Sequence, residues 1–251
     1  MAFAPPFQRP FSATFDRRAA AAAAGNGLLN ALVAYWPGNE ESGDLLDAHS
    51  NGLTLTDTNT VTNAAGKVYA TARQYTQANN EYHTRASHAL LQTGDVDFTF
   101  AAWVWLDQLA TAERWVVRKG SPWEWYLNYV PDGPNARKMR FVIRNAEVVY
   151  SAAITASAWY LVFGWHDAAN GRIGVSTNLS ANDAARTTPP TAGTGTFAIG
   201  AGAGASTNWD GRIGPCAFWK SAAGGGGVLS AAQRTALYNA GAGLAYAAFT
   251  T

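Results

Sequence analysis

Apolar and polar positions alternate with a period of two along several stretches of the chain. Met139, Phe141 and Ile143 alternate with mostly basic neighbours, and Trp, Tyr, Phe or Leu recurs at every second position of residues 123–129 and 159–165. Such a period places one side of each segment in a core and the other side in solvent. Half-buried β-strands are therefore predicted at these three stretches.

Other segments are apolar on both sides. Residues 98–106 contain almost no polar side chain, which is typical of a central strand, and residues 197–199 and 213–219 predict further strands. Turn signals separate the segments at Asn51-Gly52, at residues 131–134 and at Asn170-Gly171. Many short antiparallel strands with regular turns favour an all-β sandwich or barrel.

One short helix is predicted near the C-terminus. Ser230 and Gln233 have the spacing of a capping box, in which each side chain binds a free backbone N–H of the first turn. Ala236 and Leu237 supply an apolar side, and residues 239–241 contain the helix-ending Asn and Gly.

Residues 1–27 differ from the rest of the chain and are interpreted as an N-terminal arm, with a sandwich over residues 28–251. The arm contains regularly spaced Phe residues, namely Phe3, Phe7, Phe11 and Phe15. Prolines at 5, 6 and 10 forbid a continuous helix there. We expect an extended arm that pairs with a second copy, or with a capsid or tail protein, and sets assembly. A tail without fixed structure is the alternative.

Composition excludes several classes of protein. The 251 residues are 48% hydrophobic and 14% charged, which excludes a disordered chain. Lys and Arg number 18 against 17 Asp and Glu, so no bulk charge favours nucleic acid or a membrane surface. The single cysteine, Cys216, excludes an internal disulfide and is expected to be a buried thiol. No Sec signal or membrane-spanning stretch is recognised in the sequence.

Six segments, in this order, resemble the laminin-G-like (concanavalin A-like lectin/glucanase) jelly-roll domains. The segments are Ala34 to Gly43 followed by Asp47, Asp95 to Val104, Trp159 to Asp167, Phe197 to Gly200, Trp209 to Gly214, and Val228 to Gly243. The resemblance covers about residues 28–246. It implies a two-sheet antiparallel jelly-roll sandwich and a recognition role, on a fold that also hosts glycanases.

The chain departs from the family at two positions. Gly214 stands where the family often has Asp, and Asn178-Leu179 stands where it often has Asn-Gly. Both positions serve calcium or loop geometry in relatives, so the resemblance leaves calcium open as a ligand.

The search for catalytic groups yields no pair of the kind a glycosidase needs. Two carboxylates must flank the scissile bond, and Glu124, between two Trp residues, has no second carboxylate at a suitable spacing. It is either an acid with a raised pKa or an outward residue of an alternating strand. His166-Asp167 is either a base with its orienting acid or part of a turn. His49, His83 and His88 are interpreted as loop residues. A non-enzymatic protein is expected.

Aromatic side chains are the clearest excess, with ten Trp, ten Tyr and eleven Phe. Such rings stack on the C–H faces of sugars, while acids and amides bind the hydroxyl groups. The candidate carbohydrate-binding residues are Trp123, Trp125, Tyr126, Tyr129, Trp209 and Asp210. Core packing is the alternative role for these rings. A basic stripe of Arg137, Lys138, Arg140 and Arg144 is either a solvated face or a contact for an acidic partner.

These observations favour a structural and binding module of a large assembly, such as a phage virion decoration, head-fibre or tail protein with glycan recognition. A virion or an extracellular surface is the expected location, and a homo-oligomer, a capsid or tail protein and a surface glycan are the expected partners. A soluble lectin-like protein is the first alternative, and a glycoside hydrolase or lyase is the second.

Overall fold

The computed structural model describes residue 1, residues 25–120 and residues 123–251. The predicted N-terminal arm, with its Phe residues at 3, 7, 11 and 15, lies outside the described residues. The described fold begins beside the C-terminus, where the Asn26 amide donates to Thr250 Oγ1 over 2.6 Å.

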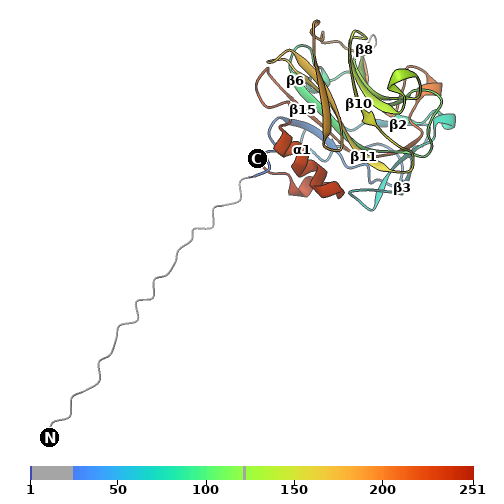
Figure 1. Cartoon of the computed structure of the whole chain (residues 1–251). Helices are drawn as coiled ribbons and strands as arrows, with labels where there is room; N and C mark the ends of the chain where they lie inside the picture. Colours follow the sequence, from blue (N-terminus) through green and yellow to red (C-terminus); the bar gives the residue numbers. More distant parts are fainter. Residues whose placement is uncertain (2–24, 121–122) are drawn as a thin grey trace.

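Two antiparallel sheets pack face to face (Figure 1). The eight-stranded sheet has the order β13 (Ser180–Ala185), β12 (Arg172–Thr177), β11 (Trp159–Asp167), β6 (Asp97–Leu106), β15 (Gly211–Ser221), β4 (Thr71–Tyr75) and β3 (Thr62–Ala65), with β1 (Leu32–Trp36) pairing β15. The seven-stranded sheet has the order β10 (Glu147–Ala153), β9 (Lys138–Ile143), β8 (Trp123–Val130), β7 (Arg114–Gly120), β14 (Phe197–Ile199), β5 (Tyr82–Arg85) and β2 (Thr56–Thr58). The predicted all-β sandwich is confirmed.

The predicted turns and the doubly buried strand are also confirmed. β6 lies between β11 and β15, and nine of its ten residues are buried. Residues 131–134 join β8 to β9, and Asn170-Gly171 joins β11 to β12. Short 3₁₀ turns occur at Gln77–Asn79, Ala89–Leu91, Gly133–Asn135, Ala205–Thr207, Asn239–Gly241 and Tyr246–Ala248.

The main core lies between the two sheets. Met139, Phe141 and Ile143 are fully buried there, as their alternation predicts. Trp125 of β8 stacks on Phe218 of β15, with ring centroids 5.8 Å apart, and so joins one sheet to the other.

Close packing of the sheets also explains one glycine. Gly164 lies opposite Phe141, and a Cβ at residue 164 would be 2.4 Å from the Phe141 ring. This position therefore excludes any larger side chain as long as Phe141 keeps its place.

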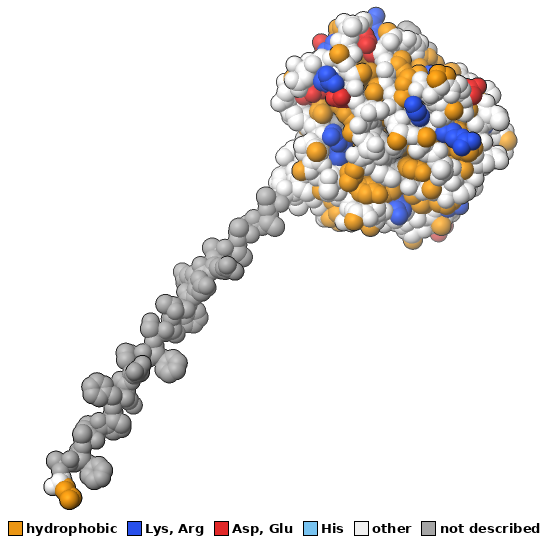
Figure 2. Space-filling model, viewed as in Figure 1, with side chains coloured by type: hydrophobic (Ala, Val, Ile, Leu, Met, Phe, Trp, Pro, Cys, Tyr) orange, Lys and Arg blue, Asp and Glu red, His pale blue; other side chains and the backbone are white. Residues whose placement is uncertain are grey.

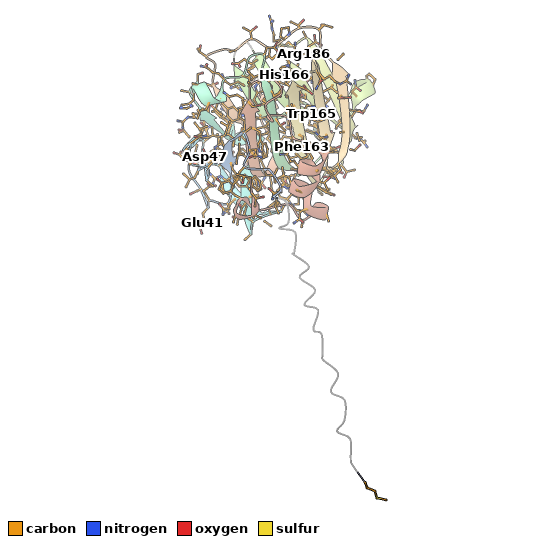
Figure 3. All side chains as sticks on the ribbon, turned by 90° about the vertical axis from the view of Figure 1, so that its left-hand side faces the viewer. Glu41, Asp47, Phe163, Trp165, His166 and Arg186 are labelled. Carbon is orange, nitrogen blue, oxygen red and sulfur yellow. The ribbon has the colours of Figure 1, made fainter. Side chains whose placement is uncertain are left out.

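A second core covers the outer face of the eight-stranded sheet. The helix α1 (Ala231–Tyr238) begins at Ser230 with the predicted capping box and ends at Asn239 in a left-handed conformation. Tyr238 stacks on Trp103 of β6 at 5.9 Å, and Figure 3 shows Phe163 and Trp165, two further members of this core, along β11. α1 and the C-terminal segment therefore cover part of this face.

Charged side chains are dispersed on the face of the molecule shown in Figure 2. On the face shown in Figure 2, Lys and Arg side chains lie singly or in small groups among hydrophobic and other side chains. No helix in the described part of the chain is long and apolar enough to cross a membrane.

Candidate functional site

An aromatic cluster lies on the outer face of the seven-stranded sheet. We call it the outer cluster, and it consists of Trp115, Trp123, Tyr126 and Val142. Trp115 of β7 stacks on Tyr126 of β8 with centroids 4.2 Å apart, and Trp123 meets Trp115 edge-on at 5.2 Å. Strand alternation explains the arrangement, because the neighbours of Tyr126, Trp125 and Leu127, point into the core.

Trp123 is the ring of this cluster that reaches solvent. Trp115 and Tyr126 are only 3% and 7% exposed, whereas Trp123 is half-buried. Trp115 and Tyr126 thus support Trp123, which remains available to contact a ligand.

Two arginines flank the outer cluster. The guanidinium carbon of Arg118 lies 5.1 Å from the centre of the Trp123 ring, and that of Arg140 lies 5.5 Å from the centre of the Tyr126 ring. Arg140 also donates to Glu113 Oε1 over 2.7 Å and to Asn128 Oδ1 over 3.1 Å, while Asn128 donates to Glu113 Oε2 over 2.8 Å. Hydrogen bonds and cation–π contacts therefore fix this side of the cluster.

An open pocket of about 400 Å³ lies beside Trp123. We call it the Trp123 pocket, and its lining residues are Gly120, Trp123, Glu124, Arg144 and residues 191–195. The volume is within the range of pockets that hold small ligands. An indole on one wall and the backbone of residues 191–195 on the other provide both an apolar face and polar groups.

A buried ion pair forms the base of this pocket. Lys119 Nζ donates to Glu124 Oε1 over 2.8 Å, and the two residues are 0% and 4% exposed. Lys119 also donates to the carbonyls of Gly193 and Gly195, and Thr93 Oγ1 donates to Glu124 Oε2 over 3.0 Å. The interpretation of Glu124 as an outward strand residue is therefore wrong, because the chain irregularity between Lys119 and Gly120 turns Glu124 inward beside Lys119.

A smaller hollow of about 200 Å³ lies on the other side of Arg118. We call it the Arg118 pocket, and it is lined by Asn80, Tyr82, Arg118, residues 201–205 and Asn208. Because Arg118 covers Trp123 and also lines this hollow, the Arg118–Trp123 pair stands between the two pockets.

The structure divides the residues predicted to bind carbohydrate. Trp125, Tyr129 and Trp209 are fully buried between the sheets, so for these three the prediction is wrong and core packing is their role. Tyr126 belongs to the outer cluster but supports Trp123 from below. Asp210 lies elsewhere and accepts a hydrogen bond from the Gln77 amide at 3.1 Å. Trp123, the remaining residue of the six, lines the Trp123 pocket.

The basic stripe also separates into different roles. Arg140 is engaged with Glu113, and Lys138 donates to Asn135 Oδ1 over 3.1 Å. Arg137 is exposed in the turn before β9, and Arg144 lines the Trp123 pocket. The four residues do not form a single contact surface.

Two histidines are buried, which the sequence did not indicate. The prediction of a loop at His83 is wrong, because His83 lies in β5. Its Nδ1 lies 2.9 Å from the Tyr75 hydroxyl, and its Nε2 lies 3.1 Å from the Gly43 carbonyl oxygen. The pKa of His83 is lowered to about 4, mainly by burial and in part by the nearby Arg73, although the hydrogen bond to the Gly43 carbonyl acts in the opposite direction.

The predicted turn at Asp167 is confirmed. Asp167 accepts hydrogen bonds from Asn170 rather than from His166. His166 Nδ1 instead donates to the Val96 carbonyl over 2.6 Å, and burial lowers the pKa of His166. Figure 3 shows His166 near Arg186 at one end of β11, and both residues approach Asp95. His166 and Asp167 therefore do not form a base and its orienting acid.

Cys216 is fully enclosed, and burial raises the pKa of its thiol far above the usual range. This confirms the predicted buried thiol.

Metal-ligating side chains do not gather in the described residues. No group of three or more His, Cys, Asp or Glu side chains there is placed to hold a metal ion. The Asn178 side chain accepts a hydrogen bond from the Leu161 amide at 3.1 Å, and a Cβ at residue 214 would be 3.3 Å from that of Trp103. Neither of the two family positions therefore offers a free oxygen ligand.

The fold and sequence agree with one protein family. The model of the concanavalin A-like lectin/glucanases superfamily matches residues 76–225, more than half of the chain. The chain therefore belongs to this superfamily. A comparison with curated proteins gave no match.

Several solved structures share the fold. Domain 4 of AbnA, an extracellular GH43 arabinanase from Geobacillus stearothermophilus determined with arabinotriose, has a TM-score of 0.61 and 18% identity, over 82% of this chain and 97% of that domain. The binding domain of Paraclostridial Mosquitocidal Protein 1 has a TM-score of 0.66 and 12% identity, over 84% and 52%. A sialidase from Trypanosoma rangeli has a TM-score of 0.60 and 14% identity, over 86% and 34%. The chain thus spans about half of the second protein and a third of the third.

Proposed function

We propose that the protein is a non-catalytic carbohydrate-binding module that contacts its glycan through Trp123 and the Trp123 pocket. The observation that carries the proposal is the half-buried indole of Trp123, which is supported by two buried rings and lines a pocket together with polar groups.

The chemistry of sugars matches this arrangement. A pyranose or furanose ring has an apolar C–H face, which packs on an indole, and a rim of hydroxyl groups that need hydrogen-bond partners. Arg144 and the backbone of residues 191–195 supply such partners around the pocket. The Lys119–Glu124 pair holds this backbone in place before a ligand arrives, which lowers the entropic cost of binding.

The arabinanase domain offers independent support, because its structure was determined with arabinotriose and it covers nearly the same length as this chain. At 18% identity the similarity shows a shared fold and does not say which sugar this chain binds.

A binding role without catalysis is favoured by the state of Glu124. It is the only carboxylate among the described residues that line the Trp123 pocket, and it is paired with Lys119. Hydrolysis by either of the usual glycosidase routes needs two carboxylates, roughly 5–10 Å apart, on opposite sides of the bond.

The test is a glycan array probed with the labelled protein, followed by incubation of each bound glycan with the protein and measurement of released reducing ends. Binding without release is the expected result. Release of reducing ends that is lost in Glu124→Gln, with the variant still folded, would replace the proposal with a glycoside hydrolase. An array without any bound glycan would contradict carbohydrate binding itself.

A further inference from the structure

We propose that the glycan recognised by this face carries a carboxylate, and that Arg118 binds it in the Arg118 pocket. The inference rests on the proposed function and adds the chemical class of the sugar: a uronic acid or another sugar with a carboxyl group.

The first observation is that the charge of Arg118 is unmatched in the described structure. Arg118 forms no ion pair with any residue that the structure describes, and its Nε is buried without a hydrogen-bond partner there. Burial also lowers the pKa of this side chain. A half-buried cation with unused donors is costly unless an anion completes it.

The second observation is the contrast with arginines in comparable settings. Arg140, on the same face, is paired with Glu113 at 2.7 Å, and Arg172, on the other sheet, is paired with Asp183 at 2.8 Å. Arg114, also on β7, donates to the Ser206 carbonyl over 2.7 Å. Arg118 is held by the Trp123 ring instead, which leaves its hydrogen-bonding edge for a ligand.

The third observation is the shape and lining of the hollow. At about 200 Å³ it has room for a carboxylate and part of a sugar ring. Asn208 donates to Asn80 Oδ1 over 2.8 Å and accepts from the Gly202 amide over 2.8 Å, so these polar groups are fixed. Among described residues, nothing accepts from the Asn80 side-chain nitrogen, which adds a donor beside Arg118.

The position of Arg118 explains why the anion belongs to a sugar. A sugar stacked on Trp123 lies beside the guanidinium that covers the same ring. A carboxylate on that sugar or on its neighbour matches the two parallel N–H bonds that a guanidinium offers. The Trp123 pocket and the Arg118 pocket then bind consecutive parts of one acidic oligosaccharide.

The experiment compares acidic oligosaccharides with neutral partners of the same backbone. The pairs are oligogalacturonate and its methyl ester, hyaluronan oligosaccharide and its carboxyl-reduced form, and sialyllactose and its methyl ester, with a sulfated carrageenan oligosaccharide, which has no carboxyl group, as a further arm. Binding is measured by calorimetry for wild type, Arg118→Gln, Arg118→Lys, and Arg172→Gln as a matched control on the other sheet.

We expect at least one acidic member to bind about ten-fold or more tightly than its neutral partner. Arg118→Gln should weaken binding of the acidic member about ten-fold more than binding of the neutral partner and so remove this preference. Arg118→Lys should retain part of the preference, and Arg172→Gln all of it. Higher salt should weaken the binding of the acidic member to wild type more than the binding of the neutral member. This measurement tests the proposal even if Arg118→Gln does not fold.

Equal affinity of wild type for every acidic and neutral pair would overturn the proposal, as would an Arg118→Gln that weakens both members alike. Tightest binding to the sulfated arm would overturn the assignment to a carboxylate. One result would overturn this inference and leave the proposed function intact: Trp123→Ala binds neither member of a pair, and Arg118→Gln keeps the preference for the acidic member. Absence of any Trp123-dependent glycan would refute both.

Discussion

At the scale of single residues, Phe141 shows how firmly the alternation of β9 fixes the core. Its ring is fully buried against Gly164 and near Phe98, with 6.2 Å between the Phe rings. We expect Phe141→Ala to lower the free energy of unfolding by about 3–5 kcal/mol, because it leaves a cavity between two close sheets. Val148→Ala, at an exposed position on β10, should cost less than about 1 kcal/mol in urea titrations. Equal losses would show that the register of this sheet is shifted.

His83 gives the fold a defined sensitivity to acid. Its pKa is lowered to about 4 by burial, below the value of about 6.5 in an unfolded chain. The unfolded state therefore binds the proton more readily, so stability from this group is complete above about pH 6.5 and is lost as the pH falls toward 4. The loss amounts to at most about 3 kcal/mol.

The measurement is the free energy of unfolding of wild type and His83→Gln at pH 7 and at pH 4.5. The variant should be destabilised at pH 7 and should lose less stability than wild type on acidification. Parallel decreases in the two proteins would show that other groups set the acid response.

At the scale of structural elements, the Lys119–Glu124 pair joins the β7–β8 hairpin to the segment between β13 and β14. Lys119→Met or Glu124→Gln alone should lower stability by about 3–5 kcal/mol, because each leaves a buried group without its partner. The double variant Lys119→Met with Glu124→Gln should cost clearly less than the sum of the two single changes. Additive losses in a double-mutant cycle would contradict the direct coupling of the two side chains.

Strand positions could be predicted from the sequence because a period of two is a local property. The pattern does not say which side of a strand meets the other sheet when both sides carry aromatic residues. Along β8, Trp125 and Tyr129 point inward whereas Tyr126 points outward, and all are aromatic. The site predicted from the sequence therefore includes rings of the core as well as rings of the outer face.

The remaining site residues depend on contacts between distant segments. Trp115 and Arg118 acquire their roles only when β7 pairs with β8, and Lys119 meets Gly193 and Gly195 across more than seventy residues. The sequence predicts a loop at His83 because the short strand β5 has no clear alternation of apolar and polar residues. The signal available for the ion pair was a Lys and a Glu of opposite charge on the two strands of one hairpin. The irregular register after Lys119 conceals that both side chains point inward.

At the scale of the whole molecule, the role of the N-terminal arm and the place on a virion stay predictions. The described residues 25–120 and 123–251 contain the two sheets, both cores and the candidate site. A variant consisting of residues 25–251 should therefore keep the circular dichroism spectrum of the full chain. We expect the full chain to be oligomeric and the variant monomeric in light scattering, because the Phe residues of the arm are expected to bind a second copy. A variant with the oligomeric state of the full chain would place the contact on the sandwich.

The central claim is that Trp123 contacts a glycan, and its most direct test is the affinity of Trp123→Ala for the glycan that wild type binds best. Trp159→Ala is the matched control, because Trp159 is also half-buried but belongs to the eight-stranded sheet. We expect calorimetry to show a loss of about ten-fold or more for Trp123→Ala and little change for Trp159→Ala, with both variants folded. Unchanged affinity in Trp123→Ala, or an equal loss in Trp159→Ala, would contradict the account.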